Sequence, residues 1–424
     1  MAKKRLLLPG LTLLLLASVA GSAPGCNSSG SSANAGAGAG GDGNSNASGA
    51  SSNAPGDAGA AGAPEGLGGA DSTGPAGDAG APGSAGSLGD AGAPSTSTAA
   101  ALPTSTFLYV YSETPDADQL IAADLQTGKQ RVVTDLRGDG SDGWEIWGAA
   151  ISPDRRRIAV ASLFDPTDED VATKLATRRI WTFNTDGGDF QRLTPVFENT
   201  GAGRKNFTIE VEDPAFSADG SSIIYDFGNW WYEGTTLEGG SLPWLVSTSG
   251  NDLPGSFPTI SSCTVIQPSV NPATGDVLFI HSVCVSSADE GIFLYPADGG
   301  TAPVKLVAKG YGAGQVDPSL ETPSWVGDGS GFVFVGGIEV TRGANTETAN
   351  SLLAYDMTTG DILPLVIPEP NTRVQSGAIS ADGNTIVYCL SHDDVYDLHL
   401  IDLTQDPLED VPITDDGKSC HPVF

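Results

Sequence analysis

The residues of this chain that could bind a metal or act as catalytic bases are few and widely spaced. Its histidines are His281, His392, His399 and His421, and the sequence has no Cys-x-x-Cys pair and no cluster of three or more closely spaced Cys and His residues. Structural zinc sites use closely spaced ligands, and the Gly-x-Ser-x-Gly elbow of α/β-hydrolases is also missing from the sequence. We therefore assign no catalytic residue, no metal and no cofactor, and keep the four histidines as weak metal-site candidates.

The cysteines predict disulfide chemistry. Apart from Cys26, four cysteines remain, an even number of the kind that exported domains pair. Cys263 and Cys284 flank a hairpin that turns midway between them, so they should face each other across two antiparallel strands. Facing Cα atoms lie about 4.5–5.5 Å apart, a separation that a disulfide accepts. Cys389 and Cys420 fall on two other strands of unknown register, and a bridge between them is left open.

Aromatic residues cluster in one segment, Asn229-Trp230-Trp231-Tyr232-Glu233. We expect this segment to lie in a long loop between two strands, residues 228–241, and we expect residues 336–350 to form another such loop. Adjacent exposed aromatic rings can anchor a protein partner or a sugar ring, so Trp230, Trp231 and Tyr232 are candidate partner-binding residues. The alternative is that one or both tryptophans pack into the fold.

An acidic run lies in another expected long loop and contains Asp165, Asp168, Glu169 and Asp170. Carboxylate oxygens suit a hard cation, but the run lacks the Asp-x-Asp-x-Asp-Gly pattern of a calcium loop. A solvated acidic loop is the favoured interpretation.

The candidate residues described above lie in a part of the chain that contains a recurring β-hairpin motif. Its clearest copy is Ile379-Ser380-Ala381-Asp382-Gly383 followed by an apolar strand, the pattern of a tight turn between two strands. Related copies begin at Ile151, Phe216, Val270 and Trp325. The glycines of the last four copies in the chain are 55, 54 and 54 residues apart. A fixed period of this length built from strands is typical of a β-propeller.

Residues 106–424 accommodate six such repeats, so we predict an all-β fold, a six-bladed β-propeller. Five blades are continuous in sequence: about Trp144–Pro195, Glu212–Phe257, Ile266–Val307, Pro323–Val366 and Gly377–Thr414. The closing blade is split, with outer strands from residues 107–134 and its inner strand from residues 420–424. This arrangement closes the ring without an open edge between the first and last blades.

The Ser-Pro/Ala-Asp-Gly hairpins, combined with units such as Ile180–Thr194, resemble the propeller repeats of the TolB-type (WD40-like) proteins. The resemblance covers about residues 106–424 and implies the six-bladed fold. TolB-type proteins carry a small α/β domain ahead of the propeller, whereas this chain has a different N-terminal region. The resemblance therefore implies the fold and not a role in the Tol–Pal system.

The N-terminal region predicts export and anchoring. Residues 1–25 have a basic start and a leucine-rich stretch, as a signal peptide does. Ala23-Pro24-Gly25-Cys26 resembles a bacterial lipoprotein signal, which implies that Cys26 is lipidated; the alternative is cleavage near Ala23 and a free Cys26 thiol. Residues 26–105 are rich in Gly, Ala and Ser and contain no aromatic residue, so we expect a disordered tether.

Charge narrows the classes of partner. The chain has a formal net charge of −32, and 46 acidic but only 17 basic residues lie in 106–424. Such a surface repels nucleic acid and anionic lipid and suits basic proteins, cations or simple solubility.

We expect a monomeric, lipid-anchored scaffold of the bacterial envelope, with the outer membrane favoured because Asn27 follows Cys26. Its partner would be an envelope protein or a cell-wall component. The alternative is a glycan-active or metal-dependent, lyase-like enzyme whose histidines converge on the central channel.

Overall fold

The computed structural model describes residues 99–114, 117–135, 146–164, 174–195, 205–233, 236–250, 254–257, 263–297, 302–310, 315–318, 323–393 and 395–424. The expected signal peptide, Cys26, most of the linker and the acidic run 165–170 lie outside these residues. Within them, no helix is long and apolar enough to cross a membrane.

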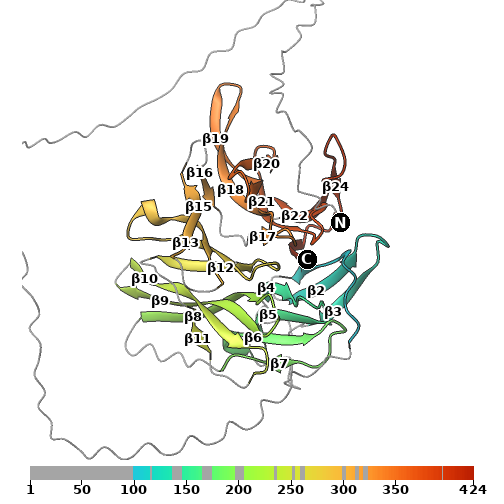
Figure 1. The fold of residues 1–424 in the computed structure, drawn as a ribbon, viewed down its shortest axis with the longest axis vertical. Helices are drawn as coiled ribbons and strands as arrows, with labels where there is room; N and C mark the ends of the chain where they lie inside the picture. Colours follow the sequence, from blue (N-terminus) through green and yellow to red (C-terminus); the bar gives the residue numbers. More distant parts are fainter. Residues whose placement is uncertain are drawn as a thin grey trace, which may run out of the picture. The chain divides into compact units, whose positions relative to one another are not determined.

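The described strands form the six-bladed propeller that the repeats predict (Figure 1). Blade 1 contains β4 (Ile146–Ile151), β5 (Arg157–Phe164), β6 (Lys174–Asn184) and β7 (Gln191–Arg192). Blade 2 contains β8 (Lys205–Phe216), β9 (Ser222–Glu233), β10 (Thr236–Ser247) and β11 (Gly255–Ser256). Blade 3 contains β12 (Thr264–Val270), β13 (Val277–Ser282), β14 (Gly291–Tyr295) and β15 (Val304–Lys309).

Blade 4 contains β17 (Ser324–Trp325), β18 (Gly331–Arg342), β19 (Asn345–Asp356) and β20 (Ile362–Val366). Blade 5 contains β21 (Thr372–Ile379), β22 (Thr385–His392), β23 (Val395–Asp402) and β24 (Asp410–Pro412). A short strand, β16 (Gln315–Pro318), pairs with both β15 and β18 and thereby links blades 3 and 4.

The closing blade is split between the two ends of the described chain, as the sequence predicts. Its strands, β1 (Thr106–Thr114), β2 (Ala117–Asp124) and β3 (Gln130–Asp135), follow β25 (Ser419–Val423) in the order β25-β1-β2-β3. The inner strands β25, β4, β8, β12, β17 and β21 contact one another in turn around the whole ring. The last strand of the chain therefore completes the fold.

The apolar core is divided among the blade junctions. Six buried clusters occur, and each combines residues of two neighbouring blades. The junction of the closing blade with blade 1, for example, packs Leu108 and Leu120 against Ile158 and Trp181, all at most 2% exposed. Because every blade buries both of its faces, removing one blade exposes two apolar surfaces at once.

The recurring Ser-x-Asp turns explain why the hairpins form at these sites. In blade 2, Ser217 Oγ donates to Asp219 Oδ1 at 2.7 Å, and the same oxygen accepts the Ser221 backbone N–H at 3.0 Å. Gly220 completes the turn with φ +73°, which only glycine adopts readily. The Ser380–Asp382 turn of blade 5 repeats the serine–aspartate bond at 2.6 Å. These turns define one rim of the propeller, the short-turn rim.

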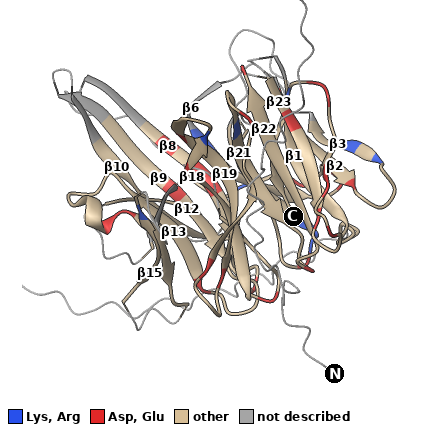
Figure 2. Cartoon of the chain, turned by 90° about the horizontal axis from the view of Figure 1, so that it is seen from above, with Lys and Arg blue, Asp and Glu red and all other residues tan. Residues whose placement is uncertain are grey.

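The opposite rim carries two extended hairpins, and here the loop expectation was wrong. Residues 228–241 and 336–350, which we expected as loops, largely belong to the 12-residue strand pairs β9–β10 and β18–β19. Pairing in β9–β10 continues to Glu233 opposite Thr236, and in β18–β19 to Arg342 opposite Asn345. Aromatic and β-branched residues favour the strand conformation, so the ladders continue beyond the blade. We call the side on which these two hairpins end the long-hairpin rim; Figure 2 shows their strands, β9, β10, β18 and β19.

The chain enters the propeller on the short-turn rim. Arg155, in the first turn of blade 1, donates from Nε to Leu102 O at 3.1 Å and from Nη2 to Pro103 O at 3.0 Å. The Leu102 N–H in return donates to Arg155 O at 2.8 Å, and Thr185 Oγ1 donates to Ala100 O at 2.9 Å. The segment that precedes β1 is thus held against blade 1, away from the long-hairpin rim.

Candidate functional site

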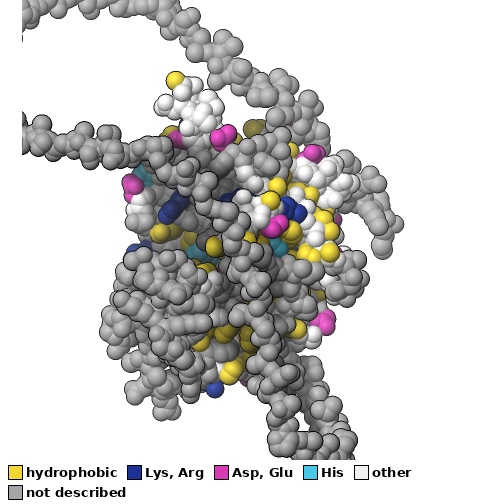
Figure 3. All heavy atoms as spheres, turned by 90° about the vertical axis from the view of Figure 1, so that its left-hand side faces the viewer, with side chains coloured by type: hydrophobic (Ala, Val, Ile, Leu, Met, Phe, Trp, Pro, Cys, Tyr) yellow, Lys and Arg dark blue, Asp and Glu magenta, His cyan; other side chains and the backbone are white. Residues whose placement is uncertain are grey.

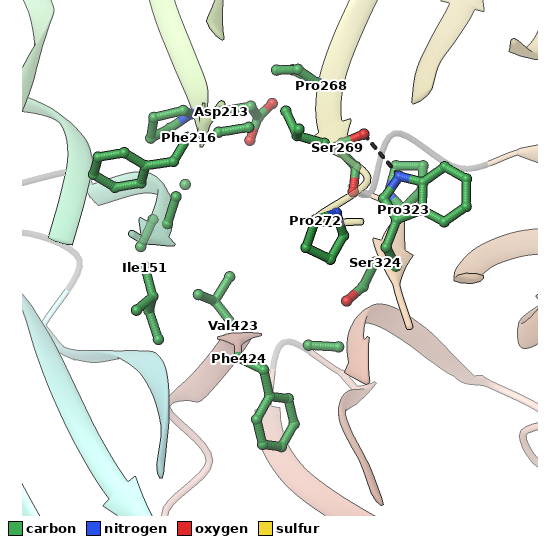
Figure 4. A pocket seen from close by; sticks show the side chains of 18 of the residues that line it. Ile151, Asp213, Phe216, Pro268, Ser269, Pro272, Pro323, Ser324, Val423 and Phe424 are labelled. Carbon is green, nitrogen blue, oxygen red and sulfur yellow. Dashed lines mark hydrogen bonds between the residues drawn. The ribbon is translucent and has the colours of Figure 1, made fainter. Parts of the chain in front are cut away.

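A cavity of about 350 Å³ lies where the inner strands of the blades meet. Figure 4 shows side chains from several blades around it, including Ile151, Phe216, Pro272 and Val423. Most of the lining is small or apolar. One wall is fixed by a bond between blades 3 and 4, in which Trp325 Nε1 donates to Ser269 O at 3.0 Å. The volume falls within the range of about 300–1,000 Å³ that is typical of small-molecule sites.

A backbone irregularity recurs at one level of the cavity wall. Gly148, Asp213 and Gln267 each lie three residues before the end of an inner strand, His421 lies two residues before the end of β25, and all four line the cavity. Each has a positive φ, of +80°, +46°, +58° and +54° respectively. Each also lies where the pairing register of its strand shifts. Non-glycine residues rarely adopt this conformation, and such strain often accompanies function.

Two carboxyl groups meet beside this level. The Asp213 and Asp226 side chains are hydrogen-bonded to each other, and burial raises the pKa of both, that of Asp213 to about 7. Asp226, on β9, is 3% exposed, and its Oδ2 accepts the Gln267 backbone N–H at 2.7 Å. At neutral pH the pair therefore holds a proton instead of two full negative charges.

One cation lies close to this carboxyl pair. Arg178, on β6, forms an ion pair with Glu212, and its guanidinium lies 4.9 Å from the ring centroid of Trp147. The positive charge of Arg178 lowers the pKa of Asp213 and partly opposes the effect of burial. The Arg178–Glu212 pair and Trp147 thus form a charged and aromatic border to the cavity wall.

Apart from the proton that the pair shares, two acceptor atoms at this site have no hydrogen-bond donor. They are Asp226 Oδ1 and Gln267 Oε1, both buried. Gln267 itself is only 5% exposed although it lines the cavity. Buried acceptors without donors are uncommon in folded proteins and call for an explanation.

The four candidate histidines do not converge, and only His421 lines the cavity. His281 is buried in blade 3, where Nε2 is 2.8 Å from Tyr295 Oη and burial lowers its pKa to about 4. His399 Nδ1 is 2.9 Å from Asp410 Oδ1, and His392 is exposed beside Asp393. Enclosure by protein lowers the pKa of His421. Among the described residues no group of three His, Cys, Asp or Glu side chains is placed to hold a metal ion.

Both cysteine pairs are bridged in the structure. Cys263–Cys284 joins the ends of β12 and β13 with Cα atoms 4.0 Å apart. Counting residues from the turn places these cysteines directly opposite each other. A register shift between Ile266 and Ser269 displaces them from that position. Cys389–Cys420 joins blade 5 to β25 of the closing blade.

The aromatic segment lies on β9, within a three-stranded ladder. Trp230 is opposite Thr208 on one side and Gly239 on the other. Its Nε1 is buried and without a hydrogen-bond partner, so part of this ring packs into the hairpin. The structure describes the backbone of Trp231 and Tyr232 but not their side chains, and the proposed anchoring role stays a prediction.

Sequence reasoning missed the Asp213–Asp226 pair. Its members are far enough apart in sequence that only the β8–β9 register, with Glu212 opposite Asp226, brings them together. A weak signal was available, because Asp213, Gln267 and His421 each precede a proline at the same place in the repeat. This recurring pair of a polar residue and a proline identifies three of the inner-strand positions that have a positive φ.

Comparison with solved structures agrees with the fold. The crystal structure of TolB from Acinetobacter baumannii matches with a TM-score of 0.51 and 17% identity, covering 75% of this chain and 66% of that one. At this identity the likeness shows the fold alone, and the match spans slightly less than two thirds of the TolB chain.

Two further solved structures are similar at lower scores. An oligogalacturonate lyase in complex with manganese matches at TM-score 0.42 and 15% identity, covering 72% of this chain and 73% of that one. A chain of a nidogen/laminin complex matches at 0.47 and 10%, covering 75% and 97%. At these scores neither likeness carries an argument about function. No protein-family model and no curated protein sequence matches the chain.

Proposed function

We propose that this protein is an exported, lipid-anchored β-propeller that binds a protein or cell-wall partner in the bacterial envelope through its long-hairpin rim. The observation that carries the proposal is the placement of the two rims. Leu102 and Pro103, at the end of the expected tether, dock on the short-turn rim through Arg155, while the β9–β10 and β18–β19 hairpins extend on the other. Anchoring by Cys26 therefore leaves the long-hairpin rim free for a partner.

The shape and charge of the propeller support binding. A closed ring in which a disulfide joins blade 5 to the closing blade is a rigid platform, and the loss of conformational freedom on binding is then small. Acidic side chains outnumber basic ones in the described strands (Figure 2). This charge favours a basic partner and speeds its encounter at low ionic strength.

A pull-down from envelope extract tests the proposal. The full-length chain is compared with a Trp230→Ala, Trp231→Ala, Tyr232→Ala variant, and its folding is checked by circular dichroism. The matched control is Gln126→Ala, Thr127→Ala, on an exposed turn of the short-turn rim. We expect a partner retained by the parent and the control but lost from the aromatic variant. Equal capture by all three would remove the aromatic segment from the proposed surface.

Membrane association is tested separately with Cys26→Ser. Multiple acyl chains give stable anchoring, so the parent should fractionate with membranes and the variant should not. A parent found only in the soluble fraction would contradict lipidation of Cys26.

A lyase-like enzyme that uses the channel is the second candidate. The observation in its favour is the cavity itself, which is lined by His421 and by Asp213, whose pKa burial raises to about 7. Perturbed ionisable groups in a cavity are common at catalytic sites. This candidate ranks second because His281, His392 and His399 lie in other environments. Turnover of acidic oligosaccharides by the purified chain, abolished by His421→Ala, would reverse the ranking.

A further inference from the structure

We propose that the central cavity binds a primary alkylammonium group, with the Asp213–Asp226 carboxyl pair and Gln267 as the recognition site. The inference does not depend on the partner proposed above. It rests on three features of the cavity: the placement of the carboxyl pair, the buried acceptors beside it and the apolar remainder of the wall.

The carboxyl pair is held in place by backbone geometry. Asp213 has φ +46° at a register shift in β8, and this strained conformation brings its side chain to the cavity wall (Figure 4). Gly148 of the neighbouring blade makes room for it: a Cβ added there would lie 2.9 Å from Asp213 Oδ1. The fold thus preserves a strained aspartate and the gap that it needs.

The acceptors of this site match the donors of an ammonium group. Asp213 and Gln267 line the cavity, and Asp226, which does not itself line it, is the hydrogen-bonded neighbour of Asp213. Apart from the proton that the carboxyl pair shares, Asp226 Oδ1 and Gln267 Oε1 have no donor, and the Asp213 carboxylate adds a third acceptor. A primary ammonium presents three N–H donors on a compact charge. One such group could satisfy all three acceptors, whereas a carboxylate or phosphate ligand would meet only acceptors and negative charge.

The remaining wall suits an alkyl chain. Pro214, Pro268, Ala149 and Val423 are among the apolar residues that line the cavity. The outer surface seen from the side in Figure 3 is a different region, where hydrophobic, charged and other polar side chains lie beside one another. An alkylammonium ion has the same two parts, a charged head for the acceptors and a chain for the apolar wall.

Binding of the cation should release a proton. The carboxyl pair shares a proton at neutral pH. When an ammonium binds, its positive charge takes the place of the proton's charge, so one proton is released to solvent for each ammonium bound. The charged groups around Asp213 are Asp226, Glu212 and Arg178, with His421 and Arg155 elsewhere on the cavity wall. Affinity should therefore rise as the pH increases through the range in which the pair ionises.

Calorimetric titration with n-butylammonium chloride tests the proposal. The full-length chain is titrated at about 0.15 M salt, which screens attraction to the acidic surface. Asp213→Asn should weaken binding about 10- to 100-fold, because a charge-assisted hydrogen bond is lost. Gln267→Leu should weaken it about 2- to 10-fold. Glu339→Gln removes the same charge from an exposed site on β18 and should leave binding unchanged.

Further titrations with other ligands distinguish a primary ammonium from a quaternary ammonium, a metal ion and a peptide side chain. Tetramethylammonium carries the charge without N–H donors, so binding equal to that of n-butylammonium would overturn the proposal. Calcium chloride that binds while n-butylammonium does not would also overturn it and assign the acceptors to a metal. If the amine binds, a capped Gly-Gly-Lys-Gly-Gly peptide and its norleucine counterpart identify the source: preference for the lysine peptide indicates a protein side chain, and binding of the free amine alone indicates a small molecule.

Equal binding by the parent and by a folded Asp213→Asn variant would remove the carboxyl pair from the site. Folding of each variant is followed by thermal unfolding, so that loss of binding is separated from loss of structure. None of these outcomes depends on a captured envelope partner, so the proposed rim surface and the proposed ammonium site can fail independently.

Discussion

Cys420, on the strand that closes the ring, is disulfide-bonded to Cys389 of blade 5, with Cα atoms 5.1 Å apart. Both residues are buried, and β25 pairs with β1 on its other side. The last strand of the chain is therefore tied to two neighbours, by hydrogen bonds to its own blade and by a covalent bond to the next. Two predictions concern this closure.

Replacing both cysteines, Cys389→Ala with Cys420→Ala, should lower the free energy of unfolding by about 2–4 kcal/mol. The disulfide restricts the unfolded chain, and its loss also frees β25 from blade 5. Denaturant unfolding measures the first effect, and limited proteolysis near the C-terminus measures the second. The matched control is the Cys263→Ala, Cys284→Ala variant, whose bridge lies within blade 3. That control should lose similar stability without new C-terminal cleavage, and cleavage in both variants would argue against a specific role in closure.

Deleting residues 419–424 should prevent stable folding, although terminal residues are often dispensable. The deletion removes β25, exposes the edge of β1 and opens the cluster that contains Cys389 and Phe107. Exposed strand edges promote aggregation. Size-exclusion chromatography of the purified deletion variant should show aggregates or no folded monomer. A monomer with the thermal transition of the parent would mean that the ring does not depend on its closing strand.

The repeat pattern predicted the ring but not its rim. Ser-x-Asp-Gly turns are local, since the serine, aspartate and glycine determine the turn among themselves, and their spacing revealed the blades. The β18–β19 hairpin was expected as a loop, because β-branched residues favour a strand but do not indicate how far it continues beyond its blade. Beyond Gly337, which also pairs with β16, the residues of the hairpin pair with each other, as Thr341 does with Thr346.

The candidate site was less predictable than the fold. Asp213 and Asp226 become neighbours only through strand register, and a register shift at Asp213 cannot be read from strand alternation. The histidines drew attention by residue type, yet type alone did not indicate that Tyr295 and Phe293 enclose His281. Residue chemistry identified candidates, whereas long-range pairing determined which of them meet.

Arg155→Met should release the segment that precedes β1. The substitution keeps an unbranched chain but removes the donors that bind Leu102 O and Pro103 O. The expected loss is about 1–2 kcal/mol of unfolding free energy, since bonds from a charged donor are replaced partly by water. Proteolysis within residues 99–105 should also become faster. Arg192→Met, at an exposed arginine on β7, is the control and should behave as the parent. Unchanged proteolysis in Arg155→Met would show that other contacts hold the segment.

The buried carboxyl pair should make the propeller less stable as the pH rises toward neutrality. Burial raises the pKa of Asp213 to about 7 and that of Asp226 as well, while in the unfolded chain both ionise near 3.8. Below that pH the pair is protonated in both the folded and the unfolded state, so it does not change the free energy of unfolding. Above it the unfolded chain ionises first, so the unfolded state gains stability until the folded pair has also lost its proton.

Asp226→Asn removes one of the two carboxyls and keeps the shape of the side chain. The fall in Tm between about pH 5 and about pH 8 should therefore be smaller in Asp226→Asn than in the parent. Glu339→Gln, which changes charge at an exposed site, should follow the parent, and an Asp226→Asn variant whose Tm falls more steeply than the parent's would contradict the assigned direction.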